Sequence, residues 1–379
     1  MSGADNTRRD ELIVAGFGFA FGLVWLLGIL YVFSQREVIE GQVQYVMGDH
    51  WRYDIEAYVR AAGRLVDDGS LYLAEQIEAP YVPGGKDYYH YSPPLGVSLV
   101  PLSGLDEHSA SVVWFALKSL ALFAACLLMP VRLPVRALTF VGVAVSFWAM
   151  RDLVLGNVGV LLVLPMALAW RWLDRPLGSV ALALTISVRP STGALLLWQL
   201  LRRRWRVAAW TIGAGIALIV LSGLVVGIDG YRDYVSVLGN MVTPGAGSEN
   251  RDLGSTLVSL GLDEEWIDLV RLGSIALGVV LVLLGLRRDR ELGFMITLAA
   301  SMLMVPLMWE YYLIMLALPL ALLADRWRPL VLLVLVLSWT PSFFAPVLLL
   351  LTLALLFVLP APPRPDSPLT ERAAEALPA

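Results

Sequence analysis

The chain has 379 residues, of which 58% are hydrophobic and 16% charged, and its mean hydropathy is +0.71. Soluble domains carry about a quarter charged residues, so this composition excludes an ordinary soluble protein and predicts an all-α polytopic membrane protein. The net charge is −4, and the single cysteine, Cys126, excludes an intrachain disulfide. The basic residues are nearly all arginine, which favours a prokaryotic source, and we expect no nucleic-acid partner.

Twelve hydrophobic segments follow one another along the chain, several of them shorter than the roughly 20 residues of a regular membrane span. We expect a single domain over residues 1–359, with about 12 transmembrane helices and a plasma-membrane location. The tail 360–379 is rich in proline and predicts disorder on the cytoplasmic side. The segments cover residues 12–33, 110–129, 137–150, 158–172, 177–188, 191–201, 207–228, 266–286, 292–307, 311–324, 329–339 and 343–359.

Arginine in the short loops predicts the orientation, because cytoplasmic loops carry an excess of Lys and Arg. With the N-terminus in the cytoplasm, alternate loops contribute their arginines to that side, and both termini are cytoplasmic. The long loops 34–109 and 229–265 then lie outside the cytoplasm. The basic positions are Arg8, Arg9, Arg132, Arg136, Arg171, Arg175, Arg202, Arg203, Arg204, Arg206, Arg287, Arg288, Arg290, Arg326 and Arg328.

The stretch around Arg189 could form one long kinked helix or two short ones. Pro190 cannot continue a regular helix, and it disfavours helix at the residue before it. One long helix would reverse the side of every later loop, so we favour two short segments with Arg189 near the outer face.

The first long loop contains an amphipathic stretch that starts at Asp54. Apolar residues recur there at helical spacing, which predicts a helix lying along the outer membrane surface. Asp54 is either the N-cap of this helix or a functional acid. A Glu at position 56 is two residues away and points to another side of a helix, so joint metal ligation is not expected.

An aromatic turn, residues 88–94 with the sequence YYHYSPP, follows in the same loop. Its tyrosines could anchor at the membrane interface or line a sugar pocket. Tyr58 and Tyr91 are the candidates for binding a sugar or an acceptor.

Charged and polar residues interrupt the later apolar segments at their outer ends. Charges at membrane depth are expensive, so they are paired or functional. Arg151 could pair with Asp152, whereas Arg151 and Arg189 together could bind a phosphate, which suits a planar guanidinium. Snorkelling to the surface is the structural alternative.

Three further places complete the candidate site. Arg251 lies in the polar stretch 245–255, which reads as a solvated linker or as a third cation for the phosphate. Asn157 follows Gly156 between two apolar segments, and Glu310 and Tyr311 follow a tryptophan at the start of another. Glu310 needs a cationic partner, and one of the outer arginines could serve.

The order of these features resembles the integral-membrane GT-C glycosyltransferases, and within them family 87 (DUF2029), which includes a mycobacterial polyprenol-phosphate-mannose-dependent α-(1→2)-mannosyltransferase. The matching residues are Asp54 with the Tyr58 helix, the stretch 69–72, YxYSPP at 89–94, LGNVG at 155–159, VRP at 188–190 before RRRWR, and PxxWxYY at 306–312. Three positions depart from the family pattern: Arg189 stands for a lysine, Asn157 lacks a preceding Gln, and Tyr311 stands where a His is frequent. A role that needs an imidazole is therefore not carried over to Tyr311.

The resemblance implies a GT-C fold and a membrane glycosyltransferase that moves mannose from a polyprenyl-phosphate donor to a lipid or glycan hydroxyl, with inversion, on the extracytoplasmic side. Asp54 is then the general base, and Arg189, Arg151 and Arg251 stabilise the leaving phosphate. We expect no cofactor and no metal. Transfer of another sugar, such as arabinose or glucose, is one alternative, and a lipid-linked sugar transporter or flippase is another.

Overall fold

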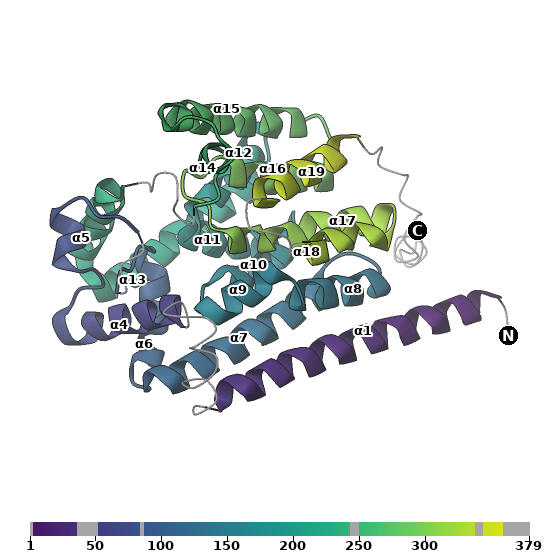
Figure 1. Cartoon of the computed structure of the whole chain (residues 1–379), viewed down its shortest axis with the longest axis horizontal. Helices are drawn as coiled ribbons and strands as arrows, with labels where there is room; N and C mark the ends of the chain where they lie inside the picture. Colours follow the sequence, from purple (N-terminus) through teal and green to yellow (C-terminus); the bar gives the residue numbers. More distant parts are fainter. Residues whose placement is uncertain (1–2, 36–51, 84–86, 243–249, 338–343, 359–379) are drawn as a thin grey trace, which may run out of the picture.

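The structure is a computed structural model of the whole chain, and it describes residues 3–35, 52–83, 87–242, 250–337 and 344–358. Its described part is all-helical, apart from one isolated β-bridge between Tyr81 and Met241 (Figure 1). The α-helical architecture predicted from the composition is confirmed. The tail 360–379 lies outside the described residues, as do parts of both long loops.

The first half of the chain contains the long N-terminal helix, the helices of the first large loop and the bent pair that follows them. The elements are α1 (Gly3–Ser34), α4 (Tyr53–Asp68), α5 (Ala74–Glu78), α6 (Pro93–Ser103), α7 (Glu107–Leu128), α8 (Leu133–Ala144), α9 (Phe147–Leu155), α10 (Gly159–Arg171) and α11 (Pro176–Val188).

The second half begins at a 3₁₀ turn, Pro190–Gly193, and contains three further 3₁₀ segments, Glu264–Trp266, Glu310–Leu316 and Pro329–Leu332. Its helices are α12 (Ala194–Leu201), α13 (Trp205–Asn240), α14 (Leu253–Ser259), α15 (Ile267–Gly285), α16 (Arg290–Leu303), α17 (Ala317–Arg326), α18 (Leu333–Leu337) and α19 (Ala345–Val358).

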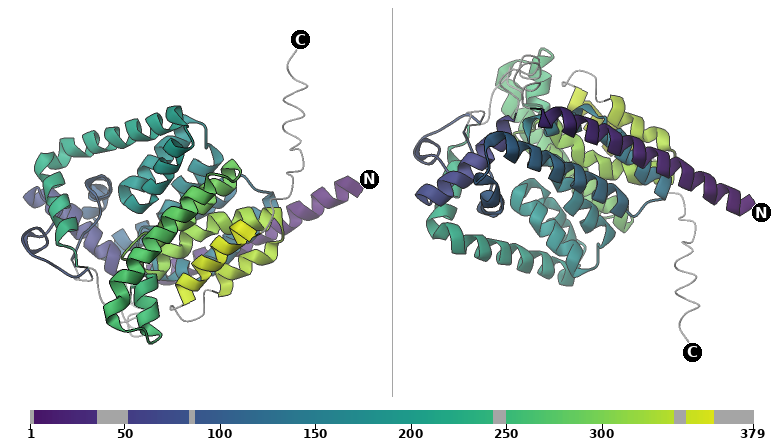
Figure 2. Two further views of the ribbon diagram at one scale, coloured as in Figure 1. Left: turned by 90° about the horizontal axis from the view of Figure 1, so that it is seen from above. Right: turned by 90° about the horizontal axis from the view of Figure 1, so that it is seen from below.

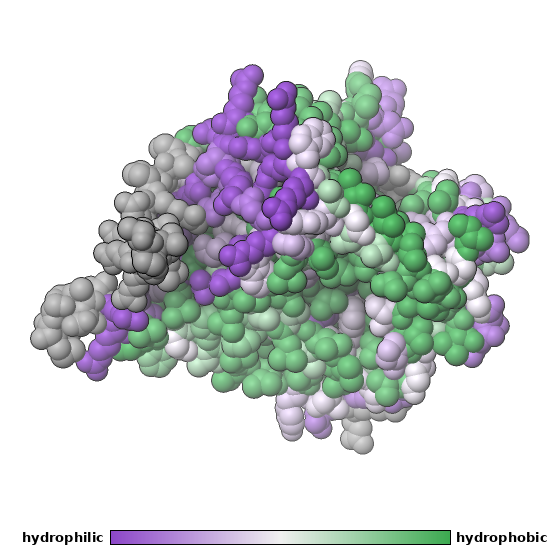
Figure 3. All heavy atoms as spheres, turned by 180° about the vertical axis from the view of Figure 1, so that it is seen from behind, coloured by the Kyte–Doolittle hydropathy of each residue, from purple (hydrophilic) through white to green (hydrophobic). Residues whose placement is uncertain are grey.

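Four of the described helices are long and apolar enough to cross a membrane: α1, α7, α13 and the helix over Glu264–Gly285. The pair α8 and α9 makes a fifth if its two parts, bent by 57°, form one span. Shorter apolar helices, α10, α11 and α19, take the places of other expected segments. Figure 3 shows a broad band of hydrophobic side chains across one face, which fits a protein embedded in lipid.

Two expected segments have a break that the hydrophobic pattern did not show. The segment 137–150 bends at Ser146, whose hydroxyl caps α9 by accepting the Ala149 N–H. Helix α13 passes the expected end of its segment, and its backbone breaks at Gly227, which has a φ of 69°. Helix α13 packs against α5 and α6 of the first large loop.

The arginine-bearing loops lie together at one end of the molecule, where Figure 3 also shows hydrophilic side chains gathered. Arg132 binds Asp325 at 2.9 Å, and Arg326 binds Asp289 at 3.2 Å. Arg204 and Arg290 both form ion pairs with Asp174. These contacts join the five loops between residues 132 and 328 that we expected on the cytoplasmic side, so these loops lie at the same end of the molecule.

Another contact at this end of the molecule shows how the chain runs at Arg189. The Ser179 hydroxyl, at the start of α11, donates to the Val207 carbonyl at the start of α13 at 3.2 Å. The chain between them must therefore leave this end of the molecule and return to it. Residues 176–188 and 190–201 are two short segments with opposite directions, as the arginine pattern indicated.

Candidate functional site

Asn157 lies at the centre of the candidate site, in the turn between α9 and α10. Its Nδ2 donates to Asp54 Oδ2 at 2.8 Å, and it lies 3.2 Å from the Tyr91 hydroxyl and 3.3 Å from the Tyr58 hydroxyl. The Gly159 N–H donates to Asn157 Oδ1 at 3.1 Å. This last bond fixes the oxygen end of the amide, so the NH₂ end must face the carboxylate.

The local sequence explains why this turn can approach α4 so closely. Gly156 ends α9 in the left-handed region, with a φ of 75°, where glycine alone is unstrained. A Cβ at this position would lie 2.5 Å from the Ile55 side chain. A glycine is therefore required both by the backbone conformation and by the contact with α4.

Asp54 lies in the first turn of α4, and it is not the N-cap. The helix begins at Tyr53, and Arg52 occupies the cap position in a left-handed conformation. The structural alternative, in which Asp54 serves as the cap, is therefore wrong, because its carboxylate bonds across the site to Asn157.

The surroundings of Asp54 change its acidity. The side chain keeps some accessible surface, but the surrounding protein desolvates its carboxyl and raises the pKa to about 7, against the Asn157 hydrogen bond, which lowers it. A carboxyl group with a pKa near neutrality is suited to accept and release a proton.

The amphipathic face of α4 packs against protein. Ile55, Tyr58, Val59, Ala62 and Leu65 are buried, and the helix contacts α6 and α7. We expected this face to lie on the membrane surface. It instead anchors the first turn of α4, and with it Asp54, to the helical core.

Tyrosines of the aromatic turn and of α4 pack together beside Asp54. The Tyr58 and Tyr91 rings meet edge to face, with their centroids 5.3 Å apart. The Tyr72 hydroxyl donates to the Tyr91 carbonyl at 2.8 Å, and the Ser92 hydroxyl bonds the Ser187 carbonyl at the end of α11. These bonds join the first large loop to the segment that carries Arg189.

Arg189 is a buried cation at the break between α11 and the 3₁₀ turn. It is 8% exposed, and its guanidinium lies 3.7 Å from the centroid of the Tyr312 ring. Its Nη1 and Nη2 have no hydrogen-bond partner among the described residues.

Electrostatics link Arg189 to Asp54 through Tyr91. Burial raises the pKa of the Tyr91 hydroxyl well above its ordinary value, and the Asp54 charge adds to this rise, while the Arg189 charge opposes it. The structure thus brings a carboxyl group and a buried cation to the same tyrosine.

Arg151, the second predicted cation, forms an ion pair with an acidic residue. Arg151 Nε lies 2.9 Å from Glu310 Oε1, so Glu310 has the arginine partner that we expected. The alternative pairing of Arg151 with Asp152 is wrong, because Asp152 pairs with Lys118 at 2.5 Å. Tyr311 stacks in parallel with Trp309 at 6.4 Å.

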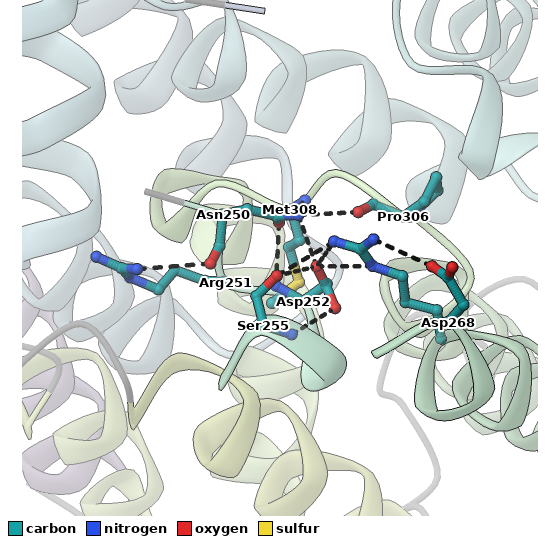
Figure 4. Close-up of polar contacts among 8 residues, drawn as sticks. Asn250, Arg251, Asp252, Ser255, Asp268, Pro306 and Met308 are labelled. Carbon is teal, nitrogen blue, oxygen red and sulfur yellow. Dashed lines mark hydrogen bonds and ion pairs between the residues drawn. The ribbon is translucent and has the colours of Figure 1, made fainter. Parts of the chain in front are cut away.

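Arg251 lies beside a cluster of polar residues that holds the second large loop in place. Asn250 Oδ1 accepts the Met308 N–H at 2.9 Å, and Asp252 binds Arg271 at 3.1 Å (Figure 4). The Arg251 N–H donates to the Met308 carbonyl at 2.6 Å, and its guanidinium donates to the Asn250 carbonyl at 3.5 Å. Arg251 is thus held next to the segment that carries Glu310.

Several residues of this region were missed by sequence reasoning. A lysine within an apolar helix is expensive, so position 118 carried a signal that could have been used. The polar residues of the second loop and the aromatic ones carried none, because they resemble linker and interface residues. The missed residues are Trp114, Lys118, Asn250, Asp252, Arg271 and Tyr312.

Two comparisons with known proteins bear on this arrangement. A search among curated proteins found no match. The sequence model of glycosyltransferase family 87 matches residues 89–309, which is more than half of the chain. The match includes Tyr91, Asn157 and Arg189, and it begins after Asp54. On this match, the chain is a member of glycosyltransferase family 87.

Proposed function

We propose that the protein transfers a sugar, with mannose as the first candidate, from a polyprenyl-phosphate donor to a hydroxyl group of a lipid or glycan. Family membership supplies the reaction class, which requires a sugar donor and an acceptor. It also weighs against the transporter alternative. The observation that carries the finer proposal is that Asn157 contacts both Asp54 and the Tyr91 hydroxyl, while the charge of the buried Arg189 also acts on Tyr91.

The choice of a phosphate donor rests on Arg189. A buried guanidinium without hydrogen-bond partners is costly to the fold. An anion with two or three oxygens satisfies its planar donors, and phosphate fits this geometry in a bidentate manner. Because Arg151 is engaged with Glu310, Arg189 is the principal phosphate ligand, with Arg151 and Arg251 as secondary cations.

The proposed chemistry is a single displacement at the anomeric carbon. The acceptor oxygen forms the new bond to this carbon while the bond to the phosphate oxygen breaks, and the electron pair leaves with the polyprenyl phosphate. Asp54, in its ionised form, takes the proton of the acceptor hydroxyl. Attack opposite to the leaving group inverts the anomeric configuration.

The other residues of the site bind the two substrates. Tyr58 and Tyr91 present aromatic faces and hydroxyls, and Asn157 holds the carboxylate of the base. Glu310 and Tyr311 lie on the segment next to Arg189, where a sugar hydroxyl can meet the acid. The site lies away from the arginine-rich end, and on the positive-inside rule we propose that the reaction takes place on the extracytoplasmic side, with both termini in the cytoplasm.

A transfer assay tests this proposal. Purified protein in detergent receives radiolabelled polyprenyl-phosphate mannose and an extract of envelope lipids, with EDTA present. We expect label to move to a new lipid or glycan and free polyprenyl phosphate to appear. Donors carrying arabinose or glucose identify the sugar if mannose is not transferred.

The decisive variant is Asp54→Asn, with Asp67→Asn as its matched control on the exposed end of the same helix. We expect the first to lose transfer and the second to keep it, with both proteins folded. An active Asp54→Asn variant contradicts the base role. Failure to transfer any lipid-linked sugar contradicts the whole proposal.

A further inference from the structure

Residues of helix α7 bond the turn that carries Asn157. No step of the proposed chemistry uses these α7 residues. The Trp114 Nε1–H donates to the Gly156 carbonyl at 2.7 Å. One helical turn further, Lys118 Nζ donates to the Asp152 carbonyl at 2.7 Å and lies 2.5 Å from Asp152 Oδ1. The Asn157 N–H donates to this same Asp152 carbonyl at 3.0 Å.

The Lys118–Asp152 pair is an ion pair buried in the interior of the helical bundle. Both side chains are 0% exposed. A buried ion pair contributes little stability compared with apolar residues of the same volume, because desolvation offsets the attraction between the charges. Its contacts with the backbone, in contrast, fix the place of one turn.

We propose that Trp114, Lys118 and Asp152 are positioning residues that hold the turn 156–157, so that the Asn157 amide meets the Asp54 carboxylate. This inference rests on the proposed role of Asp54 as the base. The chain of contacts runs from α7 through the turn to Asn157 Nδ2 and from there to Asp54 Oδ2. The residues act on the reaction only through Asp54.

The consequence for the reaction is a defined direction of change in pH dependence. The Asn157 hydrogen bond favours the ionised carboxylate, and it opposes the desolvation that raises the pKa. If the turn moves and this bond is lost, the pKa of Asp54 rises, and activity requires a higher pH. General loosening of the site admits water and lowers the pKa toward its ordinary value, so the sign of the shift separates the two causes.

Other ionisable groups around Asp54 stay in place in the Trp114→Phe variant and in its control. Charged groups come from α7, α9 and the Arg151–Glu310 pair, and tyrosine hydroxyls come from α4, the aromatic turn and the segment after Trp309. These groups are Lys118, Asp152, Arg151, Glu310, Tyr58, Tyr91, Tyr311 and Tyr312.

The first variant is Trp114→Phe, which removes the indole donor and keeps an aromatic ring. Its matched control is Trp25→Phe, because the Trp25 Nε1–H also donates to a helix-end carbonyl, that of Ala144, at 3.0 Å. Loss of one hydrogen bond predicts a decrease in kcat of about three- to tenfold. We expect an unchanged KM for the donor and an acid limb of the pH–rate profile that moves to higher pH, with neither change in the control.

A double-mutant cycle with Asn157→Ala tests the route of the effect. If Trp114 acts through Asn157, the combined variant loses no more activity than Asn157→Ala alone. The neutral pair Lys118→Met/Asp152→Asn should also lower kcat at an unchanged KM for the donor. Both removed charges act on Asp54 directly, so only Trp114→Phe tests the pH profile, and Trp114→Phe decides the matter if that pair does not fold. The inference is overturned if Trp114→Phe behaves as its control, if the two losses multiply, or if the acid limb moves to lower pH.

These outcomes are separable from failure of the proposed function. An active Asp54→Asn variant removes the base role and the inference with it. If Asp54→Asn is inactive and Trp114→Phe has wild-type kinetics, only the positioning role is ruled out.

Discussion

Replacement of Arg189 by methionine should lower activity and leave the fold as stable as before, or make it more stable. Most buried arginines hold a structure together through their hydrogen bonds, whereas the Nη atoms of Arg189 have no such partner among the described residues. Methionine has a similar volume and no charge to desolvate, so it removes the functional donors and a cost of folding together.

The magnitudes follow from the contacts of the side chain. Stacking of a desolvated guanidinium on an aromatic ring contributes about 2 kcal/mol, and Arg189 lies 3.7 Å from the Tyr312 ring centroid. Desolvation of a buried ion costs several kcal/mol, so its removal offsets the lost stacking, and we expect a net stabilisation of about 1–3 kcal/mol. Loss of a preorganised donor to the leaving phosphate lowers kcat by about 100- to 1,000-fold.

The matched control is Arg204→Met at the opposite end of the molecule. Arg204 also stacks on an aromatic ring, that of Trp198 at 5.4 Å, but it donates to the Leu173 carbonyl at 2.6 Å and pairs with Asp174. We expect its loss to destabilise the fold by about 1–2 kcal/mol and to leave kcat unchanged.

Thermal unfolding in detergent and steady-state transfer kinetics check both variants side by side. Arg189→Lys adds a third measurement, because lysine keeps the charge and loses the planar pair of donors, and we expect intermediate activity. The reasoning fails if Arg189→Met destabilises the protein more than Arg204→Met does, or if it keeps wild-type kcat.

Two further predictions concern acidity and the ion pair beside the site. Transfer should rise with pH with a midpoint near 7, because Asp54 must be ionised to act as a base and its pKa is about 7; a flat pH–rate profile between pH 5.5 and 8 contradicts this. The raised pKa also means that the folded state binds the Asp54 proton more tightly than the unfolded chain does, so this carboxyl favours folding at low pH and loses that contribution as the pH rises through 7. Glu310→Gln should destabilise the fold by about 1–2 kcal/mol, because it leaves the charge of Arg151 without the carboxylate 2.9 Å away. Thermal unfolding measures this loss, and the double change Arg151→Met/Glu310→Gln should recover part of it; a Glu310→Gln variant as stable as the wild type shows that the pair is structurally neutral.

The hydrophobic pattern predicted the helical class and the gathering of the arginine-rich loops, because both depend on residue type and order alone. The break at Pro190 could also be predicted from residue type alone, because proline removes a backbone donor wherever it stands. The bend at Ser146 was not visible, because a serine that caps a helix cannot be distinguished from one within an apolar segment without its partner.

The partners of charged residues were harder to predict than their importance. Arg151 and Asp152 are neighbours in the sequence, yet they point to different sides of α9, so Arg151 meets Glu310 and Asp152 meets Lys118. To choose between these pairings, one must know how α7 is rotated relative to α9. Packing of apolar side chains sets this rotation. Asp54 was chosen as a candidate by its type and place, and its contact with Asn157 depends on that same packing.

The site is assembled where helices end. Asn157 follows the end of α9, Arg189 follows the end of α11, and Glu310 begins a 3₁₀ segment after Pro306 and Met308. Helix ends expose backbone groups that side chains must satisfy, and they let polar side chains reach one another within an apolar bundle. A carboxyl group with a raised pKa and a cation whose Nη atoms have no hydrogen-bond partner among the described residues both act on Tyr91. A fold that held these two groups for stability alone would have paired them with each other, so we propose that a substrate comes between them.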